Sequence, residues 1–155
     1  MSARPKSFQA KPLEKPSLTL KRRLNAPPSK VFAAWTDPEK LAQWFGPADT
    51  VAGSASAELD VKVGGRFRVR FSTTNGEQHE LGGVYREVTP DQRLVFTWAW
   101  RSTPERESLV SVAFRPDGAA TLLTLTHEQF FDQAARDGHE RGWTGTLDKL
   151  ERYFG

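Results

Sequence analysis

The segment 35–47 constrains the fold of this chain more than any other part of the sequence. Asp37-Pro38 predicts a helix N-cap followed by proline in the first turn, and Gly46-Pro47 predicts the end of that short helix. Large apolar side chains repeat at helical spacing in this helix and in the turn before it: Val31, Phe32, Trp35, Leu41, Trp44 and Phe45. Two short helices that meet at a sharp corner, each apolar on one face, must pack against a larger element.

Strands supply that element. Apolar and polar residues alternate in several runs, most strictly in 66–71, where phenylalanine and valine face one side and arginine the other. Asn75-Gly76 and Asp117-Gly118 are typical of short hairpin turns. The pattern predicts strands at 18–24, 55–61, 66–71, 77–88, 93–101, 108–115 and 121–128. Most of these neighbours are joined by short turns, so we expect an antiparallel meander.

The chain closes with a predicted helix whose apolar stripe is Trp143, Leu147, Leu150 and Phe154. The order is therefore strand, two short helices, six strands and a long helix. A curved antiparallel sheet buries one face, and the last helix is the element long enough to cover it. The predicted class is α+β, with space for a ligand between the helix and the bent sheet.

Charge is concentrated at the N-terminal end. Residues 1–17 carry Arg4, Lys6, Lys11 and Lys15 against Glu14, whereas 18–155 hold 18 basic and 18 acidic residues out of totals of 22 and 19. We expect 1–17 to be a flexible, basic, proline-containing leader and 18–155 to be one domain. A neutral domain lacks the basic surface of a nucleic-acid-binding protein.

Other classes of protein are excluded or made unlikely by composition. The chain has no cysteine, so disulfides, thiolate metal sites and thiol catalysis are ruled out. No apolar run reaches membrane-spanning length, and the first residues lack the apolar core of a secretory signal. These features predict a soluble, cytoplasmic protein.

Motifs for metal, cofactor or nucleophilic chemistry are missing. Each of the three histidines, His79, His127 and His139, precedes a glutamate, but none begins a His-Glu-x-x-His motif. The sequence has no nucleophile elbow, phosphate-binding loop or dinucleotide fingerprint, so we predict no metal site and no cofactor. His127 ends a strand, which favours a local hydrogen bond over a role as proton donor or ligand anchor, and His139 is expected to face solvent near the start of the last helix.

Four motifs in order resemble the domain homologous to the activator of Hsp90 ATPase, from about Leu18 to Phe154. They are Trp35-Thr36-Asp37-Pro38-Glu39 with Leu41 and Trp44-Phe45-Gly46-Pro47; Asp60 with Gly64-Gly65; Gly83, Glu87 and Pro90 with Arg93 to Trp98; and Leu123 to His127 with Gly142-Trp143, Leu147 and Leu150. The family lies in the SRPBCC superfamily, with START domains, polyketide cyclases and the birch-pollen allergen.

This resemblance implies a helix-grip fold, a seven-stranded antiparallel sheet around a long C-terminal helix with an internal cavity. It associates the chain with the stress response but implies no single activity, since relatives bind lipids, steroids or polyketides. The chaperone activator carries a separate N-terminal domain, and only a short leader precedes the first strand here. A chaperone partner is therefore not expected, and a homodimer is the default oligomer.

Aromatic residues carry the functional prediction. The five tryptophans and ten phenylalanines exceed what a small core requires, and an aromatic wall suits a flat, apolar ligand. The predicted ligand-binding residues, with Tyr85 and His127 as polar anchors, are Trp44, Phe45, Tyr85, Trp98, Trp100, His127, Phe130 and Trp143. The preferred function is binding or sequestration of a small hydrophobic molecule without catalysis; in the alternative, these aromatics simply fill the core.

Two other functions remain open from the sequence. A cyclase-like or hydrolase-like enzyme would use Glu87, Asp60 or His127 in the same cavity. Strand parity places Glu58 and Asp60 on the same face of their strand, and Glu87 on the same face as Tyr85. The structural alternative to catalysis is that one of these acids forms an internal ion pair with an arginine. A chaperone-interaction module would use the outer surface instead.

Overall fold

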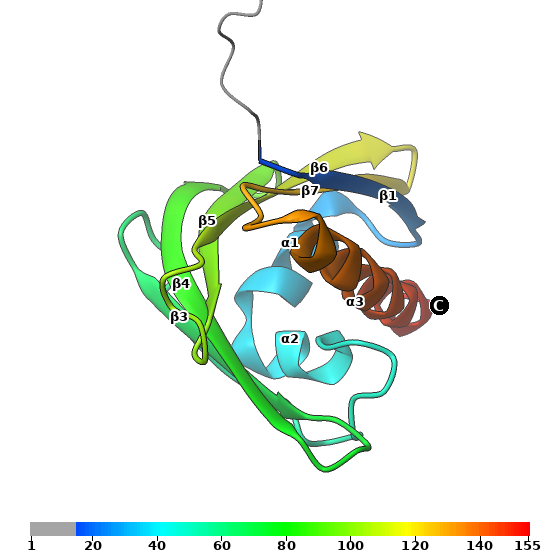
Figure 1. The fold of residues 1–155 in the computed structure, drawn as a ribbon. Coiled ribbons are helices and arrows are strands. Elements are labelled where there is room, and N and C mark those ends of the chain that lie inside the picture. The colour runs from blue at the N-terminus through cyan, green and yellow to red at the C-terminus, as the bar shows by residue number, and fades with distance from the viewer. Residues whose placement is uncertain (1–14) are drawn as a thin grey trace, which may run out of the picture.

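The computed structural model describes residues 15–155 (Figure 1). Most of the predicted leader, residues 1–14, lies outside the described residues. The elements in chain order are β1 (Leu18–Leu24), α1 (Pro28–Thr36), α2 (Pro38–Trp44), β2 (Ser56–Leu59), β3 (Arg66–Ser72), β4 (Gln78–Thr89), β5 (Arg93–Trp100), β6 (Ser108–Asp117), β7 (Ala120–Glu128) and α3 (Gln133–Tyr153). The predicted α+β helix-grip class is confirmed.

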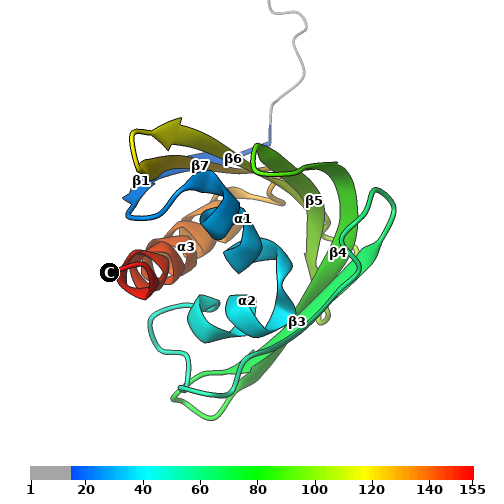
Figure 2. The same cartoon turned by 180° about the vertical axis from the view of Figure 1, so that it is seen from behind.

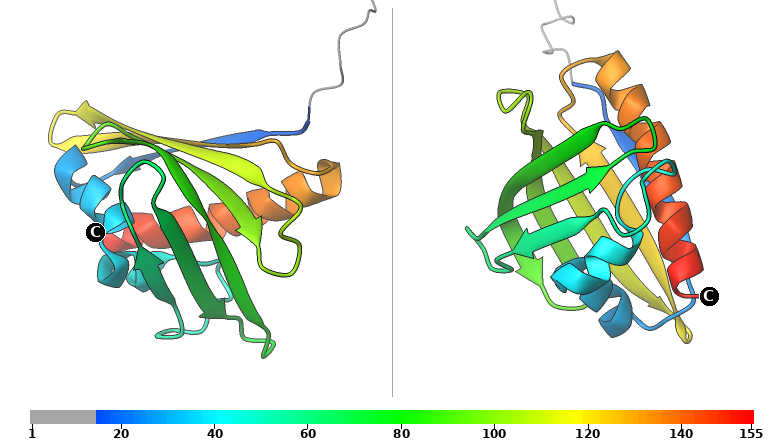
Figure 3. Two further views of the ribbon diagram at one scale, coloured as in Figure 1. Left: turned by 90° about the vertical axis from the view of Figure 1, so that its left-hand side faces the viewer. Right: turned by 90° about the horizontal axis from the view of Figure 1, so that it is seen from below.

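All strands belong to one seven-stranded antiparallel sheet in the order β1-β7-β6-β5-β4-β3-β2. Strands β2 to β7 follow each other as neighbours, and β1 joins the far edge beside β7, with Leu18 opposite His127. The sheet curls around the three helices, which all lie on its concave side (Figures 1 and 2). Figure 3 shows α3 running along the open side of this curl.

The corner between α1 and α2 forms as the sequence predicts. The Asp37 carboxylate accepts hydrogen bonds from the backbone N–H groups of Glu39 (2.9 Å) and Lys40 (3.3 Å), which caps α2. The Trp44 indole donates to the Ala34 carbonyl (3.1 Å), and the Trp35 and Trp44 rings pack edge to face at 4.8 Å. The two helices therefore insert a buried aromatic wedge into the concave side of the sheet.

Gly82 and Gly83 in β4 lie close to the backbones of the two neighbouring strands. A Cβ at Gly82 would lie 2.8 Å from the Phe67 carbonyl oxygen, and one at Gly83 would overlap the backbone carbonyl of Thr97. The Val84 N–H donates to the Thr97 hydroxyl (2.8 Å) at this point. The absence of side chains here lets β4 approach both neighbouring strands closely.

A β-bulge follows these glycines and corrects one expectation. The register between β4 and β5 shifts between Tyr85 and Glu87. A bulge adds one residue to a strand and so reverses the parity of the residues beyond it. Glu87 therefore does not share the buried face of Tyr85; its side chain is 44% exposed, with Oε1 3.3 Å from Arg93 Nε.

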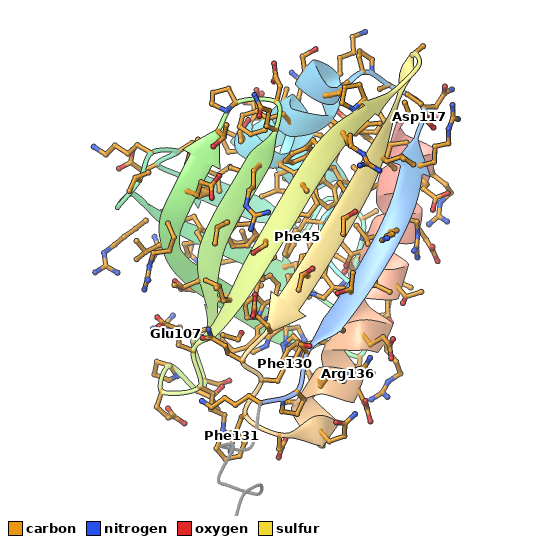
Figure 4. The ribbon with its side chains drawn as sticks, turned by 90° about the horizontal axis from the view of Figure 1, so that it is seen from above. Phe45, Glu107, Asp117, Phe130, Phe131 and Arg136 are labelled. Atoms are coloured by element: carbon orange, nitrogen blue, oxygen red, sulfur yellow. The ribbon has the colours of Figure 1, made fainter. Side chains whose placement is uncertain are left out.

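Helix α3 begins at Gln133, with the Asp132 carboxylate capping Ala135 N–H at 2.8 Å. Phe130, just before it, is buried at the end of the sheet, whereas Phe131 points outward under the Arg106 guanidinium (Figure 4). Arg136 donates to the Ser17 carbonyl at 2.9 Å and fixes the start of the helix beside β1. The helix then runs across the concave side of the sheet.

Candidate functional site: a groove between α3 and the sheet

An open groove of about 740 Å³ lies between the first half of α3 and the ends of β3, β4 and β5. This volume is within the range of small-molecule sites. Its floor is aromatic and comes from the loop after α2, from the sheet and from α3: Phe45, Phe71, Trp98, Trp100 and Trp143. Trp98 is central, with ring centroids 5.2 Å from Trp143, 5.6 Å from Trp100 and 6.1 Å from Phe45.

Part of the helix wall of the groove consists of small residues. Ala134, Ala135, Gly138 and Gly142 line it, and a Cβ added at Gly142 would meet no atom within 4 Å. Residues four apart on a helix lie on the same face, so the two glycines form a continuous strip without side chains. The width of the groove therefore depends on the absence of side chains on this face of α3.

The loop 46–49 forms one rim and is fixed to α3. A Cβ at Gly145 would lie 2.7 Å from the backbone nitrogen of Ala48, so helix and loop touch through their main chains. Lys149 Nζ donates to the carbonyls of Phe45 (3.3 Å) and Pro47 (3.5 Å), and burial lowers the pKa of this lysine. The hairpin between β3 and β4 continues this rim, since the Thr74 N–H donates to the Asp49 carbonyl (2.9 Å).

The space deeper in the fold is filled. Only about 20 Å³ remains among the side chains of Trp35, Leu41, Tyr85 and Phe96, which is about enough for one water molecule. Burial raises the pKa of the Tyr85 hydroxyl in this region, and the charge of Asp60 adds to the shift. The internal cavity implied by the family resemblance is thus packed at its centre among these side chains.

His127 is completely buried behind the groove floor. The Trp143 indole donates to Nδ1 of His127 (2.9 Å), and Nε2 lies 2.7 Å from the Ser108 hydroxyl. An indole N–H can only donate, so the proton of His127 is on Nε2. This N–H donates a hydrogen bond to the Ser108 hydroxyl, which in turn donates to the Trp98 carbonyl (3.2 Å). Burial, reinforced by His139, lowers the pKa of His127 well below its usual value.

His139 corrects a second expectation, since it does not face solvent at the start of α3. Its Nε2 accepts from the Trp100 indole (2.8 Å), and its Nδ1 donates to the Ala135 carbonyl (2.7 Å). Burial lowers the pKa of His139, while the bond to Ala135 opposes this shift. The Trp100–His139 bond connects β5 to α3 across one end of the groove.

These two histidines make the fold sensitive to acid. We expect the free energy of unfolding to be fully retained above about pH 6.5 and to fall below it, since the unfolded chain binds protons that the folded protein does not. Each histidine that stays neutral in the fold steepens this fall by up to about 1.4 kcal/mol per pH unit. Urea unfolding between about pH 7 and pH 5 measures the slope. His139→Gln should flatten it, and a pH-independent stability in wild type would contradict the prediction.

The structure brings together four of the eight predicted ligand-binding residues. Phe45, Trp98, Trp100 and Trp143 line the groove. The other four are not among its lining residues: Trp44, Tyr85, His127 and Phe130. Trp98 is 5% exposed, and its indole N–H is a buried donor in the floor that has no acceptor among residues 15–155.

The acids considered for catalysis lie outside the groove. Glu58 pairs with Arg68 (2.8 Å) on the convex face of the sheet, and Asp60 lies 3.8 Å from Lys62. Their side chains are 67% and 61% exposed, and Glu87 is also on the surface. The ion pairs of Glu58 and Glu87 are therefore external rather than internal.

A second hollow, of about 730 Å³, lies beside β3, β4 and β5 and is more polar. Its arginines, Arg70 and Arg101, both contact Glu80, at 2.9 and 3.4 Å. In the part of the chain that the structure describes, no cluster of three potential ligands for a metal ion occurs, and no helix is both long and apolar enough to cross a membrane.

The sequence alone did not predict the helix wall of the groove. The missed residues are the two glycines, Gly138 and Gly142, and the two polar residues beside them, His139 and Arg141. The two glycines are four residues apart, and this spacing was a usable signal for an open helix face. Nothing in the sequence linked His139 to Trp100, because that contact depends on how α3 crosses the sheet.

Comparison with known proteins agrees with this architecture. A protein from Chromobacterium violaceum is 25% identical, with a TM-score of 0.75 over 90% of this chain and 97% of that one. The AHSA1 protein from Silicibacter pomeroyi is 29% identical, with a TM-score of 0.73 over 89% and 96%. A protein from Rhizobium leguminosarum is 30% identical, with a TM-score of 0.72 over 91% and 95%.

No curated protein sequence matches the chain. The family model described as "Activator of Hsp90 ATPase homolog 1-like protein" matches residues 25–155, which include both short helices, six of the seven strands and α3. The chain therefore belongs to the family of Activator of Hsp90 ATPase homolog 1-like proteins, within the SRPBCC superfamily.

Proposed function

We propose that this protein binds a small, flat and largely apolar molecule in the groove between α3 and the sheet. The observation that carries the proposal is the pairing of an aromatic floor with a helix wall of glycine and alanine. Aromatic rings supply a large apolar contact area at low entropic cost, and the small residues leave a slot for a ring system.

Catalysis has less support than binding. His127 behind the floor and His139 on the helix wall have both ring nitrogens already paired, with Trp143 and Ser108 and with Trp100 and Ala135 respectively. A general acid or base must reach the substrate with a free proton or lone pair. The carboxylates considered for this role are on the outer surface.

Titration with N-phenyl-1-naphthylamine, a neutral dye that fluoresces in apolar sites, tests the proposal. We expect saturable binding at one site and a parallel change in tryptophan fluorescence, because Trp98, Trp100 and Trp143 line the groove. A bound ligand at about a hundred times its Kd also adds about 2.7 kcal/mol of stability, which raises Tm by several degrees. A dye signal that rises linearly without saturation and leaves Tm unchanged would overturn the proposal.

A further inference from the structure

Among residues 15–155, Arg141 is the one lysine or arginine that lines the groove. Its side chain is exposed, and no ion pair among residues 15–155 includes it. Arg136, on the same helix, contrasts with it: Arg136 contacts Glu140 at 2.7 Å and the Ser17 carbonyl at 2.9 Å. The guanidinium of Arg141 is therefore a cation with donors to offer at the edge of an aromatic site.

The position of this guanidinium is set by the helix wall. Nη2 of Arg141 lies 3.8 Å from the point where a Cβ of residue 138 would be. Long side chains on a helix lean toward its N-terminus, so Arg141 lies back over Gly138, and Gly138 is itself a lining residue of the groove. The charged end of Arg141 thus lies over the small-residue wall.

Two acids share the rim, and each acts on a basic group other than Arg141. Glu77 Oε1 lies 3.6 Å from His79 Nε2. The charge of Asp49 acts on Lys149 and partly offsets the lowered pKa of that lysine. Neither acid forms an ion pair with Arg141, which leaves Arg141 available for an anion from solution.

We infer that the groove selects an amphipathic acid, with a flat apolar body on the floor beside Trp98 and Trp100 and a carboxylate bound by Arg141. A guanidinium presents a planar fork that matches the two oxygens of a carboxylate. This inference rests on the proposed function, because the body of the ligand occupies the same groove.

Competition against the neutral dye separates the two ideas. The competitors are 2-naphthoate and 2-naphthamide, which share one ring system and differ in charge. We expect wild type to prefer the naphthoate by about fivefold, the size of an exposed charge pair, and to lose part of this preference as salt is added. Arg141→Gln should treat the two competitors alike, with each competition referred to the dye affinity of that variant.

Arg115→Gln is the matched control. Arg115 is an exposed arginine on β6 that is not among the groove residues, so this variant loses the same charge elsewhere and should keep the preference. Equal affinity for both competitors in wild type, or a preference that survives in Arg141→Gln, would overturn the carboxylate inference while dye binding still supports the proposed function. Failure of the dye to bind wild type would overturn the proposed function and the inference with it.

Discussion

Gly142→Leu is expected to weaken the affinity for the neutral dye by at least about tenfold, while the protein stays folded. A leucine side chain at this position would extend from the helix wall into the groove, where a Cβ meets nothing within 4 Å. Losing the buried contact of even a few ligand carbons is enough for this loss, since each buried methylene contributes about 0.8 kcal/mol. Dye titration and thermal unfolding of the same samples measure the two effects.

Folding should not suffer, because leucine is a far better helix former than glycine. The interior of a helix gains roughly 0.5–1 kcal/mol when glycine is replaced by such a residue. Gln133→Leu is the control, since it adds a leucine to the exposed first turn of α3, outside the groove residues, and should leave dye affinity unchanged. Undiminished dye binding by Gly142→Leu would place the bound dye somewhere other than the groove.

Gly83→Ala is expected to destabilise the protein by about 3 kcal/mol, at the upper end for overpacking. A Cβ at this position would overlap the Thr97 carbonyl and lie 2.7 Å from the Thr97 hydroxyl, which accepts the Val84 N–H. The neighbouring backbone of β5 is held by its own ladder to β6 and cannot move away cheaply. For a chain of this length, such a change lowers Tm by roughly 6–12 °C.

Gly142→Ala provides the contrast, since it is the same chemical change made in open space on a helix. It should stabilise the protein by roughly 0.5–1 kcal/mol. Urea unfolding of both variants tests whether local space decides the sign. A Gly83→Ala protein as stable as wild type would mean that β4 does not approach β5 as closely as described.

The fold was predictable because its signals are local. Asp37-Pro38, the alternation in 66–71 and the turn glycines each act over a few residues, and the resulting elements can pack in few ways. The predicted first strand, 18–24, coincides with β1, and the other predicted strands agree with the structure to within a few residues.

The candidate site was only partly predictable, since it depends on contacts between distant residues. Trp44 and Trp98 look alike in the sequence, yet Trp44 forms part of the buried wedge and Trp98 the groove floor. One extra residue in the β4 bulge moved Glu87 to the surface. Alternation predicts which residues share a face only while a strand stays regular.

The rim of the groove combines backbone contacts that hold the fold with side chains that do not, although its two segments are joined by the bond from the Thr74 N–H to the Asp49 carbonyl (2.9 Å). Gly145 and Lys149 tie the loop 46–49 to α3, so mutations on that side would disturb the scaffold. The other segment of the rim is the β3–β4 hairpin, whose turn is also closed by bonds from the Thr73 hydroxyl to the Asn75 side chain (2.6 Å) and from the Thr73 N–H to the Glu77 carbonyl (2.9 Å). The exposed Glu77 side chain takes no part in those bonds, which makes this position the natural starting point for redesigning ligand preference in a library that keeps the core intact.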